Sequence, residues 1–433
     1  MFSTPVLTPD GMTVRTPLPH PNPQPHTPTR HYDVVIVGGG IVGLTLASAL
    51  RTSGLRVAIV EAQSPAQSAS RQRAYAMSLV SGDIFKSLGL WPQISPHITH
   101  FQRVTLSDAD FPVAVDFRPQ DLGTESVYYA AEHHVLMTAL QNSLADGESI
   151  HYWAPARLDR VDYQGDRVQC TLTYQDATWA CTTGLIVAAD GARSPLREQA
   201  GIPTLGWQYW QSCITAVLAP ERSHQNTAYE RFWPSGPFAI LPLPGDRCQI
   251  VWTAPHAEAE ALLALPREQF MAELQRRYGP HMGRLRLLNE PMMFPVRRMQ
   301  SRRYVQSRLA LVGDAAHCCH PVGGQGLNMG IRDAAALAQV LITAHQRGED
   351  LGSDAVLKRY ERWRRRENWI ILTLTDSLNR IFSNRWWPLV VVRRAGVWAL
   401  QHLPPLKWIA LSLMTGRFGT RPRLDLTPPP VLH

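Results

Sequence analysis

The chain has 433 residues, of which 45% are hydrophobic and 18% are charged. This length and composition exclude a disordered or fibrous protein and predict one large or two medium globular domains. The formal net charge of +8 arises after residue 345, where 15 Lys and Arg stand against 7 Asp and Glu. Because Trp, Leu, Ile and Val are interspersed among these cations, we expect an anionic membrane surface and not nucleic acid as the partner.

Residues 1–30 contain eight prolines and show no apolar periodicity, which predicts a disordered leader outside the fold. The leader lacks the apolar core of a secretion signal, and the sequence leaves open whether it is a targeting segment. The six cysteines have no zinc-type spacing, and His317 and His320 lack a third ligand, so no metal site is predicted. Free thiols and the missing export signal favour a cytoplasmic protein.

Residues 32–37 form a short valine-rich run typical of a buried parallel strand, and a helical stretch follows at 44–51. Between them, Gly38 permits a tight turn, Gly40 lets the backbone approach a pyrophosphate, and Gly43 lets the helix lie close to the sheet. Val42 belongs to the same turn. A second strand at 55–60 ends in Glu61, where the ribose of an adenosine needs an acceptor. The pattern predicts a dinucleotide site.

Two further segments make the prediction more specific. The sequence Ser-Arg-Gln-Arg-Ala-Tyr-Ala-Met-Ser at 70–78 and the sequence Gly-Gln-Gly-Leu-Asn-Met-Gly-Ile-Arg-Asp at 324–333 resemble the 2-polyprenylphenol hydroxylases of ubiquinone biosynthesis. That family is a branch of the para-hydroxybenzoate hydroxylase type of flavin monooxygenase. The resemblance covers about residues 32–423 and implies FAD as cofactor, NAD(P)H and O2 as co-substrates, and transfer of one oxygen atom to a phenol ring.

The resemblance also implies individual flavin contacts. Arg73 matches the family arginine that reaches the flavin, and Asp190, after the apolar run 185–189, matches an Asp-Gly motif near the pyrophosphate. The family usually has an arginine near position 134. This chain has His134 there, which can still donate one hydrogen bond but whose charge depends on pH.

The strand at 309–312 delivers Gly313 and Asp314, whose carboxylate can accept hydrogen bonds from the ribityl hydroxyls. The loop at 321–326 opens a helix at 327–341, and its backbone N–H groups are expected at the pyrimidine edge of the flavin. The residues expected there are Gly324, Gln325, Gly326, Leu327 and Asn328. The flavin carries the chemistry. No general base is assigned, and His317 is either a candidate for proton handling or a structural turn residue.

These segments predict an α/β fold in which a Rossmann-like FAD-binding domain is discontinuous, at 31–98, 127–205 and 298–345. Alternating stretches at 103–117 and 228–253 predict antiparallel strands of a substrate domain at 99–126 and 206–297. In the family that is resembled, this sheet covers the flavin with the substrate in between. Residues 346–433 form a C-terminal helical segment, with helices expected at 360–366 and 369–378.

The C-terminal segment continues with apolar, tryptophan-rich stretches at 386–394 and 398–414, interrupted by Pro404 and Pro405. No run approaches the roughly 20 apolar residues of a transmembrane helix, so a peripheral membrane position is expected. The alternative is an apolar surface that packs on the protein body or in a dimer interface.

The resemblance implies a lipid-tailed aromatic substrate, namely a polyprenylated phenol or quinol precursor of ubiquinone or plastoquinone. It leaves open an association with other quinone-biosynthesis enzymes. The alternatives are a flavin-dependent prenyl-chain reductase or cyclase, a non-catalytic member of a quinone-synthesis assembly, and a hydroxylase of water-soluble aromatics.

Overall fold

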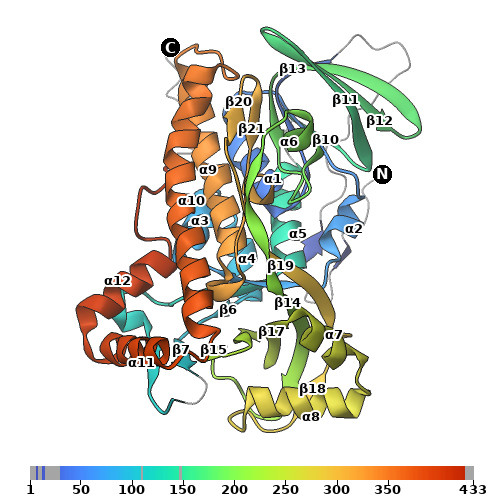
Figure 1. The fold of residues 1–433 in the computed structure, drawn as a ribbon. Coiled ribbons are helices and arrows are strands. Elements are labelled where there is room, and N and C mark those ends of the chain that lie inside the picture. The colour runs from blue at the N-terminus through green and yellow to red at the C-terminus, as the bar shows by residue number, and fades with distance from the viewer. Residues whose placement is uncertain (1–5, 8–11, 15–29, 109–110, 146–148, 425–433) are drawn as a thin grey trace.

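The computed structural model describes residues 6–7, 12–14, 30–108, 111–145 and 149–424 (Figure 1). Most of the predicted leader lies outside the described residues. Within it, β1 (Val6–Leu7) pairs with β2 (Thr13–Val14), and Met12 is buried in the main hydrophobic core. The expectation was that no residue of the leader packs on the fold. Met12 differs from it, because a single apolar side chain can be buried in the core without any apolar periodicity around it.

The first domain is built on a parallel sheet. Its strands, in spatial order, are β10 (Ile150–Trp153), β4 (Val57–Val60), β3 (Arg30–Val37), β13 (Ala177–Ala188) and β21 (Leu309–Leu311). The antiparallel strands β11 (Ala156–Gln164) and β12 (Arg167–Tyr174) extend from β13, and β20 (Val305–Gln306) pairs with β21. The central strands are buried on both faces, which explains their uninterrupted apolar sequences.

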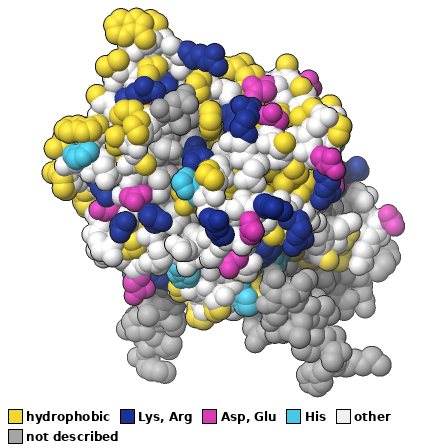
Figure 2. All heavy atoms as spheres, turned by 90° about the horizontal axis from the view of Figure 1, so that it is seen from below, with side chains coloured by type: hydrophobic (Ala, Val, Ile, Leu, Met, Phe, Trp, Pro, Cys, Tyr) yellow, Lys and Arg dark blue, Asp and Glu magenta, His cyan; other side chains and the backbone are white. Residues whose placement is uncertain are grey.

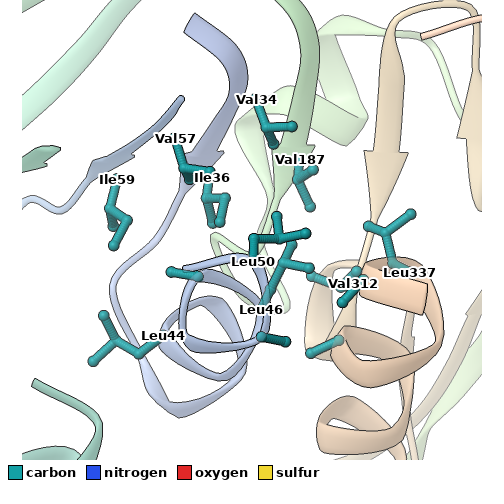
Figure 3. Close-up of a cluster of buried hydrophobic side chains, with 14 of the residues drawn as sticks. Val34, Ile36, Leu44, Leu46, Leu50, Val57, Ile59, Val187, Val312 and Leu337 are labelled. Atoms are coloured by element: carbon teal, nitrogen blue, oxygen red, sulfur yellow. The ribbon is translucent and has the colours of Figure 1, made fainter. Parts of the chain in front are cut away.

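Three helices pack together against this sheet. They are α1 (Ile41–Leu50), α5 (His133–Leu144) and α9 (Gln325–Gln346), and α1 contacts both of the others as well as β3 and β4. Figure 3 shows how side chains of β3, β4, β13, α1 and α9, such as Ile36, Val57, Val187, Leu46 and Leu337, fill one core. Helix α1 begins at Ile41, three residues before the predicted start, because the chain enters the helix directly from an extended Gly40.

The second sheet is mostly antiparallel. Its order is β22 (His317–Cys318), β19 (Met292–Ser301), β14 (Thr204–Pro220), β17 (Arg247–Pro255), β16 (Gly236–Leu243), β15 (Thr227–Trp233), β7 (Arg103–Asp108) and β8 (Ala114–Phe117), and β18 (Leu285–Leu287) pairs with β14. Its outer face packs on α7 (His256–Ala264) and α8 (Arg267–Tyr278). Strand β22 lies in the loop after β21, so this loop joins the two sheets.

The smaller elements complete the first domain. A three-stranded sheet contains β5 (Ala74–Met77), β9 (Tyr129–Glu132) and β6 (Thr99–His100), and the shorter helices are α2 (Pro65–Ala69), α3 (Leu79–Ser87), α4 (Trp91–Ile94) and α6 (Pro195–Gln199). The predicted fold class, a discontinuous Rossmann-like domain with an antiparallel-sheet domain and a C-terminal helical segment, is confirmed.

The described part of the C-terminal segment contains three helices. The two helices expected at 360–366 and 369–378 are a single helix, α10 (Asp354–Phe382), because Asn368 between them is a buried partner of the core and not a break. Helices α11 (Trp387–His402) and α12 (Pro404–Met414) follow and lie at the lower left of Figure 1, beside β7 and β8. Among the described residues, none of the helices has the length and apolar character needed to span a bilayer.

Candidate functional site

A cavity of about 880 Å³ lies where the parallel strands end and the antiparallel sheet begins. Its wall includes residues that follow three parallel strands. These are Gly40 to Val42 after β3, Ala189, Gly191 and Ala192 after β13, and Asp314 after β21. Much of the loop 321–327 also belongs to the wall. Segments that are almost 290 positions apart in the sequence therefore meet at the carboxyl edge of one parallel sheet, which is where such folds bind ligands.

The glycines of the first turn have two different roles. A Cβ atom on Gly38, where φ is +110°, would lie 2.3 Å from the carbonyl oxygen of Ala189, and one on Gly43 would lie 2.0 Å from that of Gly38. Neither residue lines the cavity, and both are needed for the turn to pack. A Cβ atom on Gly40 would meet nothing within 4 Å. The space in front of Gly40 thus belongs to the cavity, as an approaching phosphate group requires.

Glu61 is attached to the same turn. Its Oε2 accepts a hydrogen bond of 2.6 Å from the backbone N–H of Gly39, and its Oε1 accepts one of 2.8 Å from Gln63. The carboxylate therefore connects the end of β4 to the glycine turn, next to the cavity wall and not within it.

Asp190 lies behind the wall, between Ala189 and Gly191, which line the cavity. Its Oδ1 is buried without a hydrogen-bond partner among the described residues, and its Oδ2 accepts a long bond of 3.4 Å from the backbone of Leu196. Burial raises the pKa of this carboxyl above its usual range. A buried oxygen without a partner beside a cavity is the kind of atom that a bound ligand or an ordered water satisfies.

Asp314 and Arg73 are exposed on the wall. No hydrogen bond or ion pair reaches the Asp314 carboxylate within the described part of the chain. The Arg73 guanidinium lies 5.1 Å from the ring centre of Phe294 and 5.3 Å from that of Tyr75. Both polar groups are thus free to meet a ligand. Gly313, which precedes Asp314, is itself buried against Val42, at a φ of +60°.

The loop before α9 presents its backbone to the cavity. Gly323 and Gly324 have φ values of +64° and +61°, and Gly324, Gly326 and Leu327 line the wall. Gln325 and Asn328 instead turn inward. Gln325 donates to the Tyr128 hydroxyl at 2.9 Å.

Asn328 connects the loop to the chain around β5. Its amide oxygen accepts from the backbone of Ser78 at 2.8 Å, and its nitrogen donates to the carbonyl oxygens of Ala76 and Gly324 at 2.9 and 2.8 Å. The predicted contacts Gln325 and Asn328 are thus placed as supports of the loop.

The three histidines near the site differ in position. His133 lines the cavity, with Nδ1 3.0 Å from the Tyr75 hydroxyl, and burial lowers its pKa to about 4, so that the ring is neutral near pH 7. His134, the predicted contact, is half-buried and does not line the cavity. His317 is fully buried behind the wall, and its Nε2 lies 2.5 Å from Asp333.

Asp333 is the centre of a buried polar network that holds the loop at Gly313. Its carboxylate accepts hydrogen bonds from the backbone of Gly313 at 3.2 Å and from Arg364 and Asn368 of α10 at 2.8 and 2.9 Å. Burial alone favours the neutral acid, but His317 and Arg364 more than offset it and hold the pKa of Asp333 below its usual range. The geometry makes His317 a member of this network.

These residues fit a dinucleotide cofactor. The open space at Gly40 and the free carboxylate of Asp314 lie along one cavity, and the unsatisfied oxygen of Asp190 lies behind its wall. Tyr75, His133 and Glu230 also line the cavity and were not predicted from the sequence. The signal for Glu230 was present, since it stands between Ala228 and Phe232 in the two-residue period of a strand.

The comparisons with known proteins agree with this geometry. A family model described as FAD binding domain matches residues 31–375. Ubiquinone hydroxylase UbiL of Rhodospirillum rubrum is 38% identical over 90% of this chain and 91% of its own. The 3-demethoxyubiquinol 3-hydroxylase of Escherichia coli is 34% identical over 89% and 98%.

Among solved structures, p-nitrophenol 4-monooxygenase of Pseudomonas putida superposes with a TM-score of 0.77 at 19% identity, over 90% of this chain and 100% of its own, which shows the shared fold. The family typically uses NAD(P)H as reductant. The protein belongs to the FAD-binding domain family and is a flavin-dependent monooxygenase of the ubiquinone hydroxylase group.

Proposed function

We propose that the protein hydroxylates the aromatic ring of a polyprenylated phenol or quinol precursor in quinone biosynthesis, at a membrane surface. Two relatives that match most of the chain are named for hydroxylation in the ubiquinone series. The observation that carries the proposal is the shape of the cavity, which does not end at the flavin segments.

The cavity continues between the antiparallel sheet and the C-terminal helices. Its distant wall is apolar and is formed by Leu374 and Leu378 of α10, Ala399 and Leu400 of α11, and Leu406 and Ile409 of α12. Leu406 and Ile409 are 43% and 44% exposed. One cavity thus extends from the flavin segments to α12, as a substrate with an aromatic head and a long apolar tail requires.

The outer surface of α11 and α12 suits an apolar phase. Large apolar side chains are exposed there, namely Trp386, Trp387, Val391, Val392, Trp398, Leu403, Leu406, Trp408 and Ile409. Hydrophobic side chains gather on the left of the molecule seen from below (Figure 2), the side on which Figure 1 places these helices. Aromatic side chains beside cations are typical of segments that lie in the headgroup region of a bilayer.

Several arginines of the C-terminal helices are already paired with carboxylates of the protein and are therefore less available to anionic lipid than the sequence suggests. Arg393 is buried and forms a two-bond ion pair with Asp108, at 2.9 and 3.0 Å, and Arg394 contacts the same carboxylate at 3.3 Å. Arg380 pairs with Asp376 at 3.0 Å. Arg393 and Arg394 tie α11 to Asp108 of β7, and Arg380 is paired within α10, so apolar burial and not charge is expected to dominate membrane binding.

For the cofactor, we propose that the cavity-lining residues contact FAD directly. They are Gly40, Val42, Arg73, Asp314, Gly324, Gly326 and Leu327. Asp314 accepts from the ribityl hydroxyls, and Glu61 and Asp190 hold the backbone on which the adenosine and pyrophosphate ends lie. Bound FAD supplies electron transfer from NAD(P)H and activation of O2, while the chain orients the ring of the substrate and excludes water.

The test is reconstitution of the purified protein with FAD in vesicles that contain a prenylphenol. We expect substrate-dependent consumption of O2 and NAD(P)H, and a product that contains one additional oxygen atom. Reduction or cyclisation of the prenyl chain without O2 consumption would favour a reductase or cyclase. A protein that binds FAD but never oxidises NAD(P)H in response to substrate would favour a non-catalytic role.

A further inference from the structure

Among the described residues of the antiparallel sheet, one carboxyl group lines the cavity. A row of residues in direct register crosses five strands, and all five line the cavity: Thr215, Val251, Ala239, Glu230 and Leu106. Among the cavity-lining residues of the described chain, only Glu230 and Asp314 carry a carboxyl group. Asp314 lies on the Rossmann-like side, so Glu230 is the acidic group on the opposite wall.

Glu230 lies directly across from the loop that opens α9. The backbone N–H of Gly323 hydrogen-bonds its carboxylate, which places Glu230 next to the loop expected at the flavin ring. Its neighbours along and across the strands are Ala228 and Ala239. Two methyl side chains leave room in front of the carboxyl group for a planar ring.

In the described part of the chain, no Lys, Arg or His forms an ion pair with Glu230. Burial raises its pKa to about 8, and the Gly323 N–H only partly offsets that effect. Glu132, by contrast, is paired, since its carboxylate accepts two hydrogen bonds from Arg247 at 2.7 and 3.1 Å. An unpaired carboxyl group in apolar surroundings costs stability. Packing therefore does not explain why a carboxyl group lies at this position, whereas a polar ligand in the cavity would explain it.

We propose that Glu230 is a catalytic residue that receives the phenolic hydroxyl of the substrate and takes its proton. The proposal rests on the proposed function. The phenolic O–H bond breaks, its electron pair stays on the phenol oxygen, and a new O–H bond forms on the Glu230 carboxylate. Nothing is oxidised or reduced in this step. A phenolate ring is richer in electrons than a phenol ring, which favours transfer of an electrophilic oxygen atom, and the proton returns to the product oxygen or passes to solvent.

The first test measures binding to the oxidised holoenzyme. A prenylphenol and its O-methyl ether are titrated, and the change in flavin absorbance is recorded. The titration is run above pH 8, where Glu230 is ionised. A hydrogen bond to an ionised group contributes about 1.5–3 kcal/mol, so wild type should prefer the phenol by about tenfold to a hundredfold. Glu230→Leu should lose this preference while it keeps the affinity for the ether. Thr215→Val, in the same row, should retain the preference. A Glu230→Leu protein that still prefers the phenol would overturn the inference.

The second test measures turnover with phenols of graded acidity. Glu230→Gln keeps the size of the side chain but cannot take a proton, so kcat for an ordinary phenol should fall by about 10² or more with KM little changed. Phenols acidic enough to bind in ionised form should largely restore kcat in the variant. An equal loss across the series would refute proton transfer to Glu230. A wild-type protein that hydroxylates no phenol would refute the proposed function itself, whereas an active Glu230→Gln would refute only this inference.

Discussion

Asp333 accepts a hydrogen bond from the backbone of Gly313, the residue that precedes Asp314. Although the two carboxylates are this near in structure, we expect one substitution to affect FAD binding and the other to affect stability. Asp314 exposes its carboxylate to the cavity without a partner in the described chain, whereas Asp333 is fully buried and accepts hydrogen bonds from Gly313, His317, Arg364 and Asn368. We therefore expect Asp314→Ala to weaken FAD binding without loss of stability, and Asp333→Ala to destabilise the fold.

The magnitudes follow from these contacts. Loss of one charge-assisted hydrogen bond costs about 1.5–3 kcal/mol, so Asp314→Ala should weaken FAD binding by about tenfold to a hundredfold. Because no protein group loses a partner, the stability of the apoprotein should change by no more than about 0.5 kcal/mol. Removal of Asp333 takes away one of the two carboxylate partners of the buried Arg364, the other being Glu367, and leaves the N–H groups of Gly313 and Asn368 without this acceptor. Each buried polar group left unsatisfied costs about 1–3 kcal/mol, so the total is a large part of the stability of a domain.

The assay combines two measurements on the same preparations. FAD affinity is measured by titration of apoprotein with FAD, and stability by thermal unfolding of the apoprotein. Asp314→Asn serves as the matched control for charge, since it retains the size and one acceptor oxygen. Wild-type FAD affinity in Asp314→Ala would refute the assignment of this carboxylate to the cofactor, and wild-type stability in Asp333→Ala would refute the role of the buried network.

Three further outcomes are expected. Gly40→Val should fold with wild-type thermal stability, because its Cβ meets open space, but should contain little FAD when purified; full FAD content would show that the cofactor does not approach this turn. The raised pKa of Glu230 means that the native state binds this proton more tightly than the unfolded chain between pH 4.5 and about 8, so stability should fall as pH rises through that window. Thermal unfolding of Glu230→Gln should lack this loss, which can reach roughly 1.4 kcal/mol per pH unit, and parallel pH curves for both proteins would contradict the shift. Joint replacement of Trp386 and Trp387 by Ser, at positions 66% and 73% exposed, should release the protein from vesicles, whereas Tyr163→Ser on β11 should not; equal co-sedimentation of both variants would leave α11 as a packing surface.

The sequence predicted the parallel strands and the glycine turns well, because continuous apolar runs and residues that permit positive φ are local signals. It did not indicate the contacts of Gln325 and Asn328 within the protein, since these depend on which way each side chain of the first helical turn faces. Both turn inward to the Tyr128 hydroxyl and to the chain around β5.

Buried polar contacts explain most of the remaining differences. Asn368 looks like a gap between two helices, but it donates to Asp333 and belongs to one continuous α10. Arg393 looks like a free cation for lipid, but it is buried against Asp108, 285 positions earlier in the chain. Such long-range pairs leave no periodic trace in a single sequence. The alternation of residues along β15 indicates which face of the strand Glu230 lies on. Its proposed role also depends on the loop at Gly323, which faces it across the cavity and which the strand sequence does not indicate.

The most direct test of the central claim is incorporation of isotopically labelled O2. Purified holoenzyme is incubated with NAD(P)H and a prenylphenol in vesicles under labelled O2, and the product is analysed by mass spectrometry. A flavin-dependent hydroxylase of this substrate class should place one labelled oxygen atom on the aromatic ring of each product molecule. A product without the label, or NAD(P)H oxidation that yields no hydroxylated ring, would contradict the account.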